Sequence, residues 1–99
     1  MQKSVLDFIE KYQLQTNAQS RYIDLVSEVG ELGKEILICT KYGKKELITN
    51  NKMSDELGDC LFSLLALSCE LDIDAKEALQ NSLSKYEHRF NINENIGTI

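Results

Sequence analysis

The residues best suited to chemistry are two pairs of carboxylates, each with its members three positions apart. Glu28 and Glu31 form the first pair, and Glu56 and Asp59 form the second. Residues three apart in a helix occupy neighbouring positions on one face, so each pair would present its two acids together. Both pairs lie in segments rich in apolar residues. This pattern predicts that four carboxylates converge inside a helical core.

Carboxylates that converge in this way repel one another unless a cation neutralises them. Because every ligand would be an oxygen, the pattern predicts a hard divalent cation, Mg²⁺ or Mn²⁺. The predicted metal ligands are Glu28, Glu31, Glu56 and Asp59. Proteins commonly use such cations to handle phosphate groups, so the sequence favours a substrate that contains phosphate.

The alternative for the first pair is an ordinary solvated helix face. The pair belongs to a longer acidic stripe, and such stripes are common on exposed helices. The second pair favours the metal, because Asp59 adjoins Cys60 and Leu61 at the start of a long apolar run. A buried carboxylate without a partner is strongly destabilising at such a position.

Hydrophobic periodicity predicts an all-α fold, a four-helix bundle-like domain. The expected helices cover residues 4–14, 17–40 or 20–40, 54–71 or 55–71, and 74–90. The tail 91–99 lacks periodicity and is expected to be mobile. Ser4 and Asp74 are the expected caps of the first and fourth helices. The third expected helix is apolar on nearly every side, which predicts that it is central and also associates with another subunit.

The segment 42–53, in which Asn50 and Asn51 predict a turn, has to bring the two acidic pairs together. Glu31 lies about 15 Å before the end of the second expected helix, at 1.5 Å per residue, whereas Glu56 lies at the beginning of the third. The connection must therefore run back along the second helix, beside the acidic residues. Gly30 and Gly33 lie inside that helix, where each costs about 1 kcal/mol relative to alanine. We therefore expect another helix or a ligand to approach them closely.

The composition limits the class of protein. The 99 residues form one domain, 1–99, and the net charge of −5 argues against a broad nucleic-acid-binding surface. The longest uncharged apolar run, 60–69, is too short to span a bilayer, so no membrane partner is expected. The three cysteines form no C-x-x-C pair and are expected to be free thiols in a reducing cytoplasm. His88 is the single histidine and has no cysteine near it, which argues against zinc.

The stretches YIDLVSEVGELGKEIL and MSDELGDCLFSLLALSCELDIDAKEAL resemble the all-α nucleoside triphosphate pyrophosphohydrolases of the MazG-like family. The signature of that family is E-E-x-x-E, a long spacer, and then E-x-x-D. Here Glu28 and Glu31 match the later two acids of the first block, and Glu56 and Asp59 match the second. The spacer between Glu31 and Glu56 is 24 residues. Ser27 replaces the first acid of the signature, which is a departure from the family pattern.

The resemblance implies an enzyme that cleaves nucleoside triphosphates between the α and β phosphates, with Mg²⁺ or Mn²⁺, to give a nucleoside monophosphate and pyrophosphate. The catalytic candidates are Glu28, Glu31 and Glu35, and either Glu28 or Glu35 would take the proton of the attacking water. The resemblance also implies phosphate contacts from Lys85 and Arg89, and Lys52 is a further candidate. An ordinary charged surface is the alternative for these basic residues.

The expected partners are a nucleoside triphosphate and further copies of the chain, as a homodimer or homotetramer. The competing interpretation is a non-catalytic nucleotide-sensing or partner-binding helical module of the same fold. Ser27 would suit such a module, whereas the intact acids Glu28, Glu31, Glu56 and Asp59 argue for an enzyme.

Overall fold

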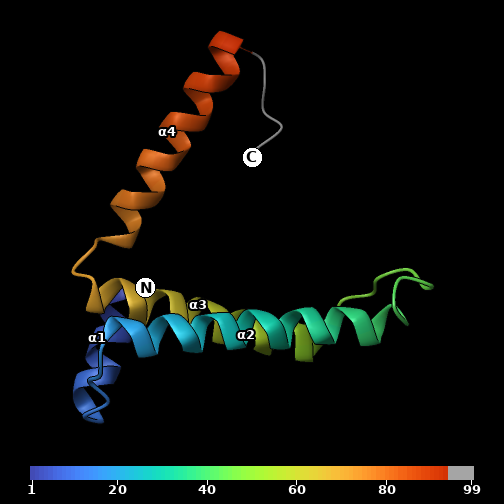
Figure 1. Ribbon diagram of the computed structural model, residues 1–99, viewed down its shortest axis with the longest axis horizontal. Helices are drawn as coiled ribbons and strands as arrows, with labels where there is room; N and C mark the ends of the chain where they lie inside the picture. Colours follow the sequence, from blue (N-terminus) through green and yellow to red (C-terminus); the bar gives the residue numbers. More distant parts are fainter. Residues whose placement is uncertain (94–99) are drawn as a thin grey trace.

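The computed structural model describes residues 1–93, and within them the chain is entirely helical, as the sequence predicts. Its four helices are α1 (Gln2–Lys11), α2 (Ala18–Cys39), α3 (Asn51–Glu70) and α4 (Ala75–Asn93). Helices α2 and α3 lie side by side and antiparallel, and α4 rises away from them (Figure 1). Helix α3 packs against both α1 and α2, so it has the central place that its apolar composition predicts.

Three of the four helices begin at a side chain that accepts a hydrogen bond from the first turn. Asn17 Oδ1 accepts from the Ser20 amide at 2.8 Å, and Asn50 Oδ1 accepts from the Met53 amide at 2.8 Å. Asp74 Oδ1 accepts from the Glu77 amide at 3.1 Å, as predicted. These bonds satisfy amides that have no partner inside the helix.

Four predicted boundaries, in three of the helices, are wrong. Helix α1 begins before Ser4, and the side chain of its N-cap residue, Met1, makes no capping hydrogen bond. The helix ends at Lys11, because Gln13 adopts a left-handed φ of 54°. Helix α3 begins before residue 54, because Asn50 is a helix cap rather than part of a turn. Helix α4 extends to Asn93, so the first residues of the predicted mobile tail are helical, and residues 94–99 lie outside the described part.

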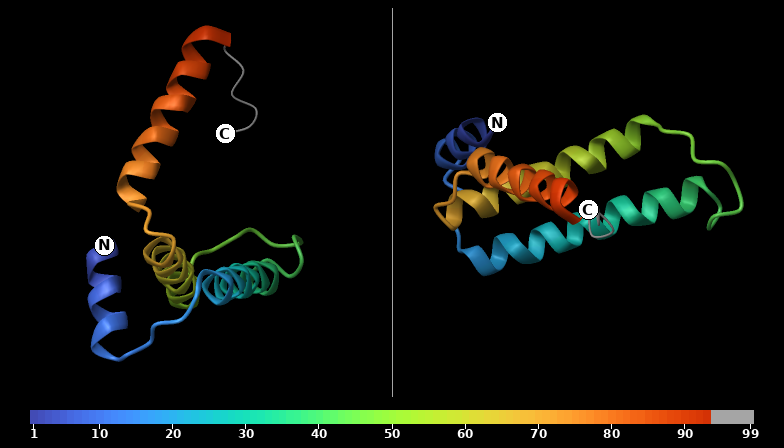
Figure 2. Two further views of the ribbon diagram at one scale, coloured as in Figure 1. Left: turned by 60° about the vertical axis from the view of Figure 1, so that its left-hand side comes forward. Right: turned by 90° about the horizontal axis from the view of Figure 1, so that it is seen from above.

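The connection between α2 and α3 reverses the chain at the far end of the helix pair (Figure 2). Lys41, Tyr42 and Gly43 follow one another with positive φ values of 48°, 59° and 86°. Such a left-handed run ends a helix, and glycine adopts it most easily. The loop then returns to Asn50, so the first turn of α3 lies beside the last turns of α2.

Polar clamps join α2 and α3 at both ends of the pair. At one end the buried Arg21 donates to the Leu14 carbonyl at 2.6 Å and lies 4.0 Å from Glu70. At the other end Glu35 contacts Asn50 and Lys52. Between these clamps, residues 1–93 contain no other polar side-chain contact that joins the two helices.

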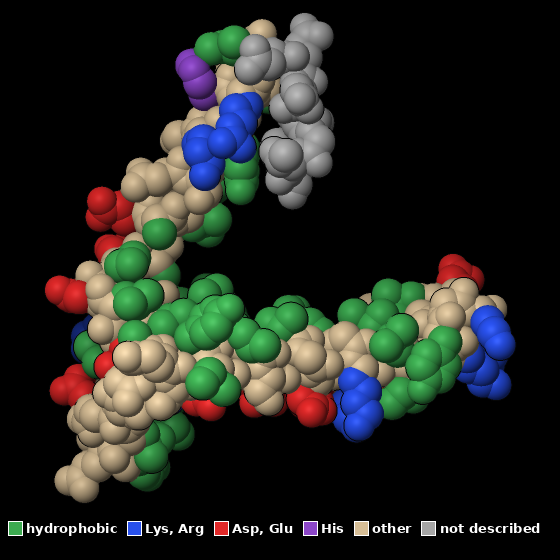
Figure 3. Space-filling view, in the orientation of Figure 1, with side chains coloured by type: hydrophobic (Ala, Val, Ile, Leu, Met, Phe, Trp, Pro, Cys, Tyr) green, Lys and Arg blue, Asp and Glu red, His purple; other side chains and the backbone are tan. Residues whose placement is uncertain are grey.

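The hydrophobic core of a single chain is thin. Its buried apolar side chains are Ile9, Met53, Leu65 and Ala66. Many large apolar side chains of α3 and α4 are exposed instead, including Leu57, Leu64, Leu79 and Leu83. Figure 3 shows apolar side chains on the face of the α2–α3 pair that is turned toward α4, and along the side of α4 above it. Helix α4 thus leaves the apolar face of the pair uncovered.

Helix α4 is tied to the rest of the chain mainly through Gln2. Gln2 Nε2 donates to the Ile73 carbonyl and Gln2 Oε1 accepts from the Ala75 amide, both at 2.7 Å. These bonds fix the start of α4, and the rest of the helix rises away from the α2–α3 pair (Figure 1). Among residues 1–93, none of the helices is both long enough and apolar enough to cross a bilayer.

Candidate functional site

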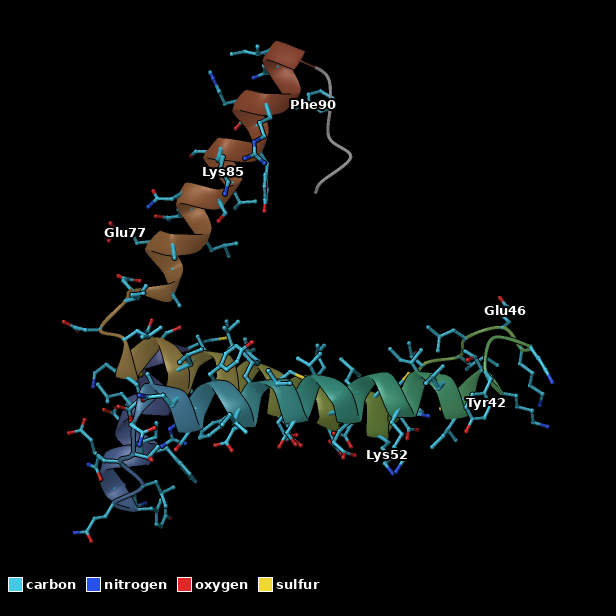
Figure 4. All side chains as sticks on the ribbon, viewed as in Figure 1. Tyr42, Glu46, Lys52, Glu77, Lys85 and Phe90 are labelled. Carbon is cyan, nitrogen blue, oxygen red and sulfur yellow. The ribbon has the colours of Figure 1, made fainter. Side chains whose placement is uncertain are left out.

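Three of the four predicted metal ligands come together in the structure. Glu28 from α2 and Glu56 and Asp59 from α3 each offer one carboxylate oxygen, and these oxygens lie within 4.8 Å of one another. Glu28 and Glu56 are half-buried and Asp59 is exposed. We call these three residues the acidic cluster. Figure 4 shows side-chain oxygens along the edge of the helix pair that also carries the labelled Lys52.

The fourth predicted ligand, Glu31, lies outside the acidic cluster and is exposed. It is still close enough for its charge to act on Glu28. The prediction that Asp59 is buried is wrong for the single chain. The buried positions of α3 are Met53 and a set that begins only at Ser63, so Asp59 precedes the run that α1 and α2 cover.

The acidic cluster is strongly electronegative. Partial burial raises the pKa of Glu28, and the carboxylates of Asp59, Glu56, Glu31 and Asp24 raise it further. Burial also raises the pKa of the Cys60 thiol, with further contributions from the charges of Glu28, Glu56 and Asp59. Both shifts have the same two causes, because burial and neighbouring negative charges each disfavour an added negative charge.

The acidic cluster fits a hard divalent cation. It offers only oxygen donors, which Mg²⁺ and Mn²⁺ prefer. Two oxygens bound to one Mg²⁺ lie at most about 4.2 Å apart, because each bond is about 2.1 Å long. The oxygens of the acidic cluster lie within 4.8 Å of one another, so small side-chain rotations would bring all three into the coordination shell.

Glu35, predicted as a catalytic residue, lies apart from the acidic cluster, and its carboxylate is engaged. Oε1 accepts from the Cys39 thiol at 3.1 Å and from Asn50 Nδ2 at 3.4 Å, and Oε2 lies 3.7 Å from Lys52 Nζ. The hydrogen bond from Cys39 holds the pKa of Glu35 below its ordinary value, with help from Asn50 and Lys52 and against the effect of burial. A low pKa and occupied oxygens make Glu35 a poor general base.

Sequence reasoning missed the partners of Glu35. Cys39 lies one helical turn after Glu35, a spacing that places the two side chains on one face of α2. That spacing was visible in the sequence, whereas Asn50 comes from a different helix end and depends on the fold. The same hydrogen bond raises the pKa of the Cys39 thiol, which therefore stays protonated at neutral pH.

The structure does not bring the predicted phosphate contacts to the acidic cluster of the same chain. Lys85 and Arg89 flank the ring of Tyr86 on α4, with Lys85 Nζ 5.2 Å and Arg89 Cζ 5.8 Å from its centroid. Figure 4 shows Lys85 on the projecting helix α4, well away from the α2–α3 pair. Lys52 lies at the acidic edge, but it is paired with Glu35.

Comparisons with known proteins give one family. A family model described as the MazG nucleotide pyrophosphohydrolase domain matches residues 15–92. The chain is 37% identical over 68 residues to a Bacillus subtilis (strain 168) protein named uncharacterized protein YpjD. That match covers 66% of this chain and 60% of the relative, so the chain spans less than two thirds of the relative's length. No solved structure matches the chain.

Proposed function

The chain belongs to the MazG nucleotide pyrophosphohydrolase domain family, and we propose that it hydrolyses nucleoside triphosphates between the α and β phosphates. The products would be a nucleoside monophosphate and pyrophosphate. The observation that carries this proposal is the convergence of Glu28, Glu56 and Asp59 from two helices. Three carboxylates facing an anionic polyphosphate require a cation between them, which makes the proposed activity dependent on Mg²⁺ or Mn²⁺.

The chain's own residues would hold that cation and orient the substrate. Glu28, Glu56 and Asp59 supply three oxygens, and the exposed Glu31 is free to rotate toward them as a fourth ligand. A bound divalent cation would offset phosphate charge and lower the pKa of a water molecule. Catalysis of this kind consists mostly of positioning and charge stabilisation.

We further propose that a second copy of the chain covers the apolar face between the α2–α3 pair and α4. Leu61 and Leu64 of α3 and Leu79 of α4 line one groove there. Burying apolar surface of this kind contributes about 25 cal/mol per Å², so its exposure in a single chain favours association. Because Lys85 and Arg89 lie away from the acids of their own chain, we propose that they contact phosphates bound to another copy.

The activity is tested by incubating the protein with Mg²⁺ and a panel of canonical and modified nucleoside triphosphates. We expect release of pyrophosphate and monophosphate that EDTA abolishes and that Glu56→Gln reduces at least about 100-fold, because an essential ligand is lost. Glu10→Gln is the matched control, since Glu10 is an exposed acid on α1. Release of orthophosphate, or full activity in Glu56→Gln, would contradict the proposal.

A second candidate function is a nucleotide-sensing module without turnover. The place of Lys85 on the projecting helix α4 favours it (Figure 4), as does Ser27 at a position where the family signature has an acid. The same experiment separates the two functions. Metal-dependent nucleotide binding without product would support the sensing module.

A further inference from the structure

Glu35 is the most buried acid of α2, with 8% of its surface exposed. Its contacts reach across to the beginning of α3. Asn50, which Glu35 contacts through Nδ2, is at the same time the N-cap of α3, because its Oδ1 accepts from the Met53 amide. Asn50 Nδ2 also donates to Cys39 Sγ at 3.0 Å. Glu35 and Cys39 therefore hold the residue at which α3 begins.

These contacts bear on the register of the helix pair, that is, on which turn of α3 lies beside which turn of α2. Glu28 precedes Glu35 by seven residues on α2, and Asp59 follows Lys52 by seven residues on α3. Seven residues are about two helical turns, or about 10 Å, and they return a side chain to nearly the same face. In an antiparallel pair, contact between Glu35 and Lys52 therefore places Glu28 opposite Asp59 two turns further on.

Contacts elsewhere in the helix pair have to hold the three carboxylates of the acidic cluster near one another. Its three carboxylates repel one another, and no polar contact among the described residues joins α2 to α3 beside them. The clamp at Arg21 and Glu70 lies eleven residues from Asp59 along α3, whereas the clamp at Lys52 lies only seven away. On α2 the two clamps lie equally far from Glu28, seven residues each, so the Glu35 clamp is the nearer restraint on the α3 side of the acidic cluster.

We propose that Glu35 is a positioning residue of the metal centre, which sets the register of α3 through Asn50 and Lys52 and thereby the spacing of Glu28, Glu56 and Asp59. This inference rests on the proposed function in so far as the acidic cluster binds a divalent cation. In this role Glu35 would contact neither the cation nor the substrate. Residues that orient metal ligands from outside typically change metal affinity about 10–100-fold when they are altered.

The sharpest variant is Asn50→Asp. Aspartate caps a helix about as well as asparagine, so α3 keeps its N-cap. It has no amide hydrogen to donate, so the links to Glu35 and Cys39 are lost and a second carboxylate faces Glu35. Asn17→Asp is the matched control, because it makes the same change at the N-cap of α2, where no such link exists.

The readout is the affinity for Mn²⁺ alone, measured from the electron paramagnetic resonance signal of free Mn²⁺, with thermal melting of each variant in EDTA alongside. We expect Asn50→Asp to weaken Mn²⁺ binding about tenfold or more and Asn17→Asp to leave it within about twofold. Electrostatics alone predict the reverse sign, because Asn50→Asp adds a negative charge near the acids. Glu35→Gln, which keeps an oxygen for Cys39 and Asn50, should weaken binding less than Asn50→Asp does.

Three results would overturn the proposal. Unchanged or tighter Mn²⁺ binding in Asn50→Asp would show that the clamp does not space the acids. Loss of turnover in Glu35→Gln at unchanged Mn²⁺ affinity would make Glu35 a general base instead. Failure of the unaltered protein to bind Mn²⁺ would remove the metal centre itself, and with it the proposed function, which the first two results leave intact.

Discussion

At the scale of single residues, Glu28 has the surroundings least like those of an ordinary surface glutamate. Burial and four neighbouring carboxylates raise its pKa, so the folded protein holds a proton on Glu28 more tightly than the unfolded chain does. Protons and a divalent cation would compete for the same carboxylate. The metal-free protein therefore carries an energetic cost whenever Glu28 is ionised.

This cost gives a prediction for stability without metal. Since the folded-state pKa of Glu28 is raised, its contribution to stability falls as pH rises above its ordinary value of 4.5 and through the folded value. Glu28→Gln should therefore be more stable than the unaltered protein at neutral pH in EDTA, and the difference should shrink toward pH 4.5. Denaturant unfolding at several pH values measures it, and a less stable Glu28→Gln at neutral pH would refute the argument.

The pKa of Glu35 is shifted in the opposite direction, so Glu28 and Glu35 affect the stability of the fold in different ranges of pH. Its folded-state pKa is lowered, so its stabilising contribution is complete above its ordinary pKa of 4.5 and is lost as pH falls below it. The comparison of Glu28→Gln with the unaltered protein above pH 4.5 is therefore free of this effect, because Glu35 stays ionised there in both proteins.

At the scale of helices, the sequence predicted which segments are helical and much of how they begin. The cap at Asp74 followed from its type and its place before a periodic stretch, and Asn17 was one of two starts considered for α2. Asn50 was misinterpreted because asparagine favours turns and helix caps alike, and only its contacts with Met53 and Glu35 decide between them.

The acidic cluster could also be predicted only in part, because its geometry depends on contacts between helices. The spacing of the acids placed each pair on one face of its helix. It could not fix how α2 is rotated about its own axis, because the stripe of acids is broad enough to allow several rotations. In the structure Glu35 contacts Asn50 and Lys52, and Glu28, seven residues before it on nearly the same face, lies in the cluster while Glu31 does not.

Helix α2 also carries glycines that the fold of one chain does not explain. A Cβ atom added at Gly33 would meet nothing within 4 Å, although we expected a close approach there. Gly33→Ala should therefore stabilise the protein by about 0.5–1 kcal/mol, through higher helix propensity. Urea unfolding measures the change. A loss of stability would indicate that another molecule packs on this part of α2.

At the scale of the whole molecule, the exposed apolar faces are the main feature that a single chain leaves unexplained. The predicted four-helix bundle would bury the apolar side chains of α4, yet Leu79 and Leu83 are 59% and 57% exposed. An apolar stripe indicates that one face of a helix is buried, but it does not indicate whether that face packs against the same chain or against another copy. For the same reason, the sequence could not place α4 relative to α2 and α3.

Self-association through these faces gives a direct prediction. We expect the protein to sediment as a dimer or larger oligomer, and we expect Leu83→Glu to shift it toward the monomer. Leu83 is already exposed in one chain, so the change should not disrupt folding. Ile48→Glu is the matched control, since Ile48 is 76% exposed in the loop between α2 and α3. A monomeric unaltered protein, or equal effects of both changes, would contradict the proposed interface.

The most direct measurement is anomalous X-ray diffraction from crystals grown with Mn²⁺, which locates the metal independently of any activity. The convergence of acids from α2 and α3 predicts a peak within bonding distance of Glu28, Glu56 and Asp59, in every copy of the chain. A peak bound only by other residues, or an acidic cluster without metal at millimolar Mn²⁺, would contradict it.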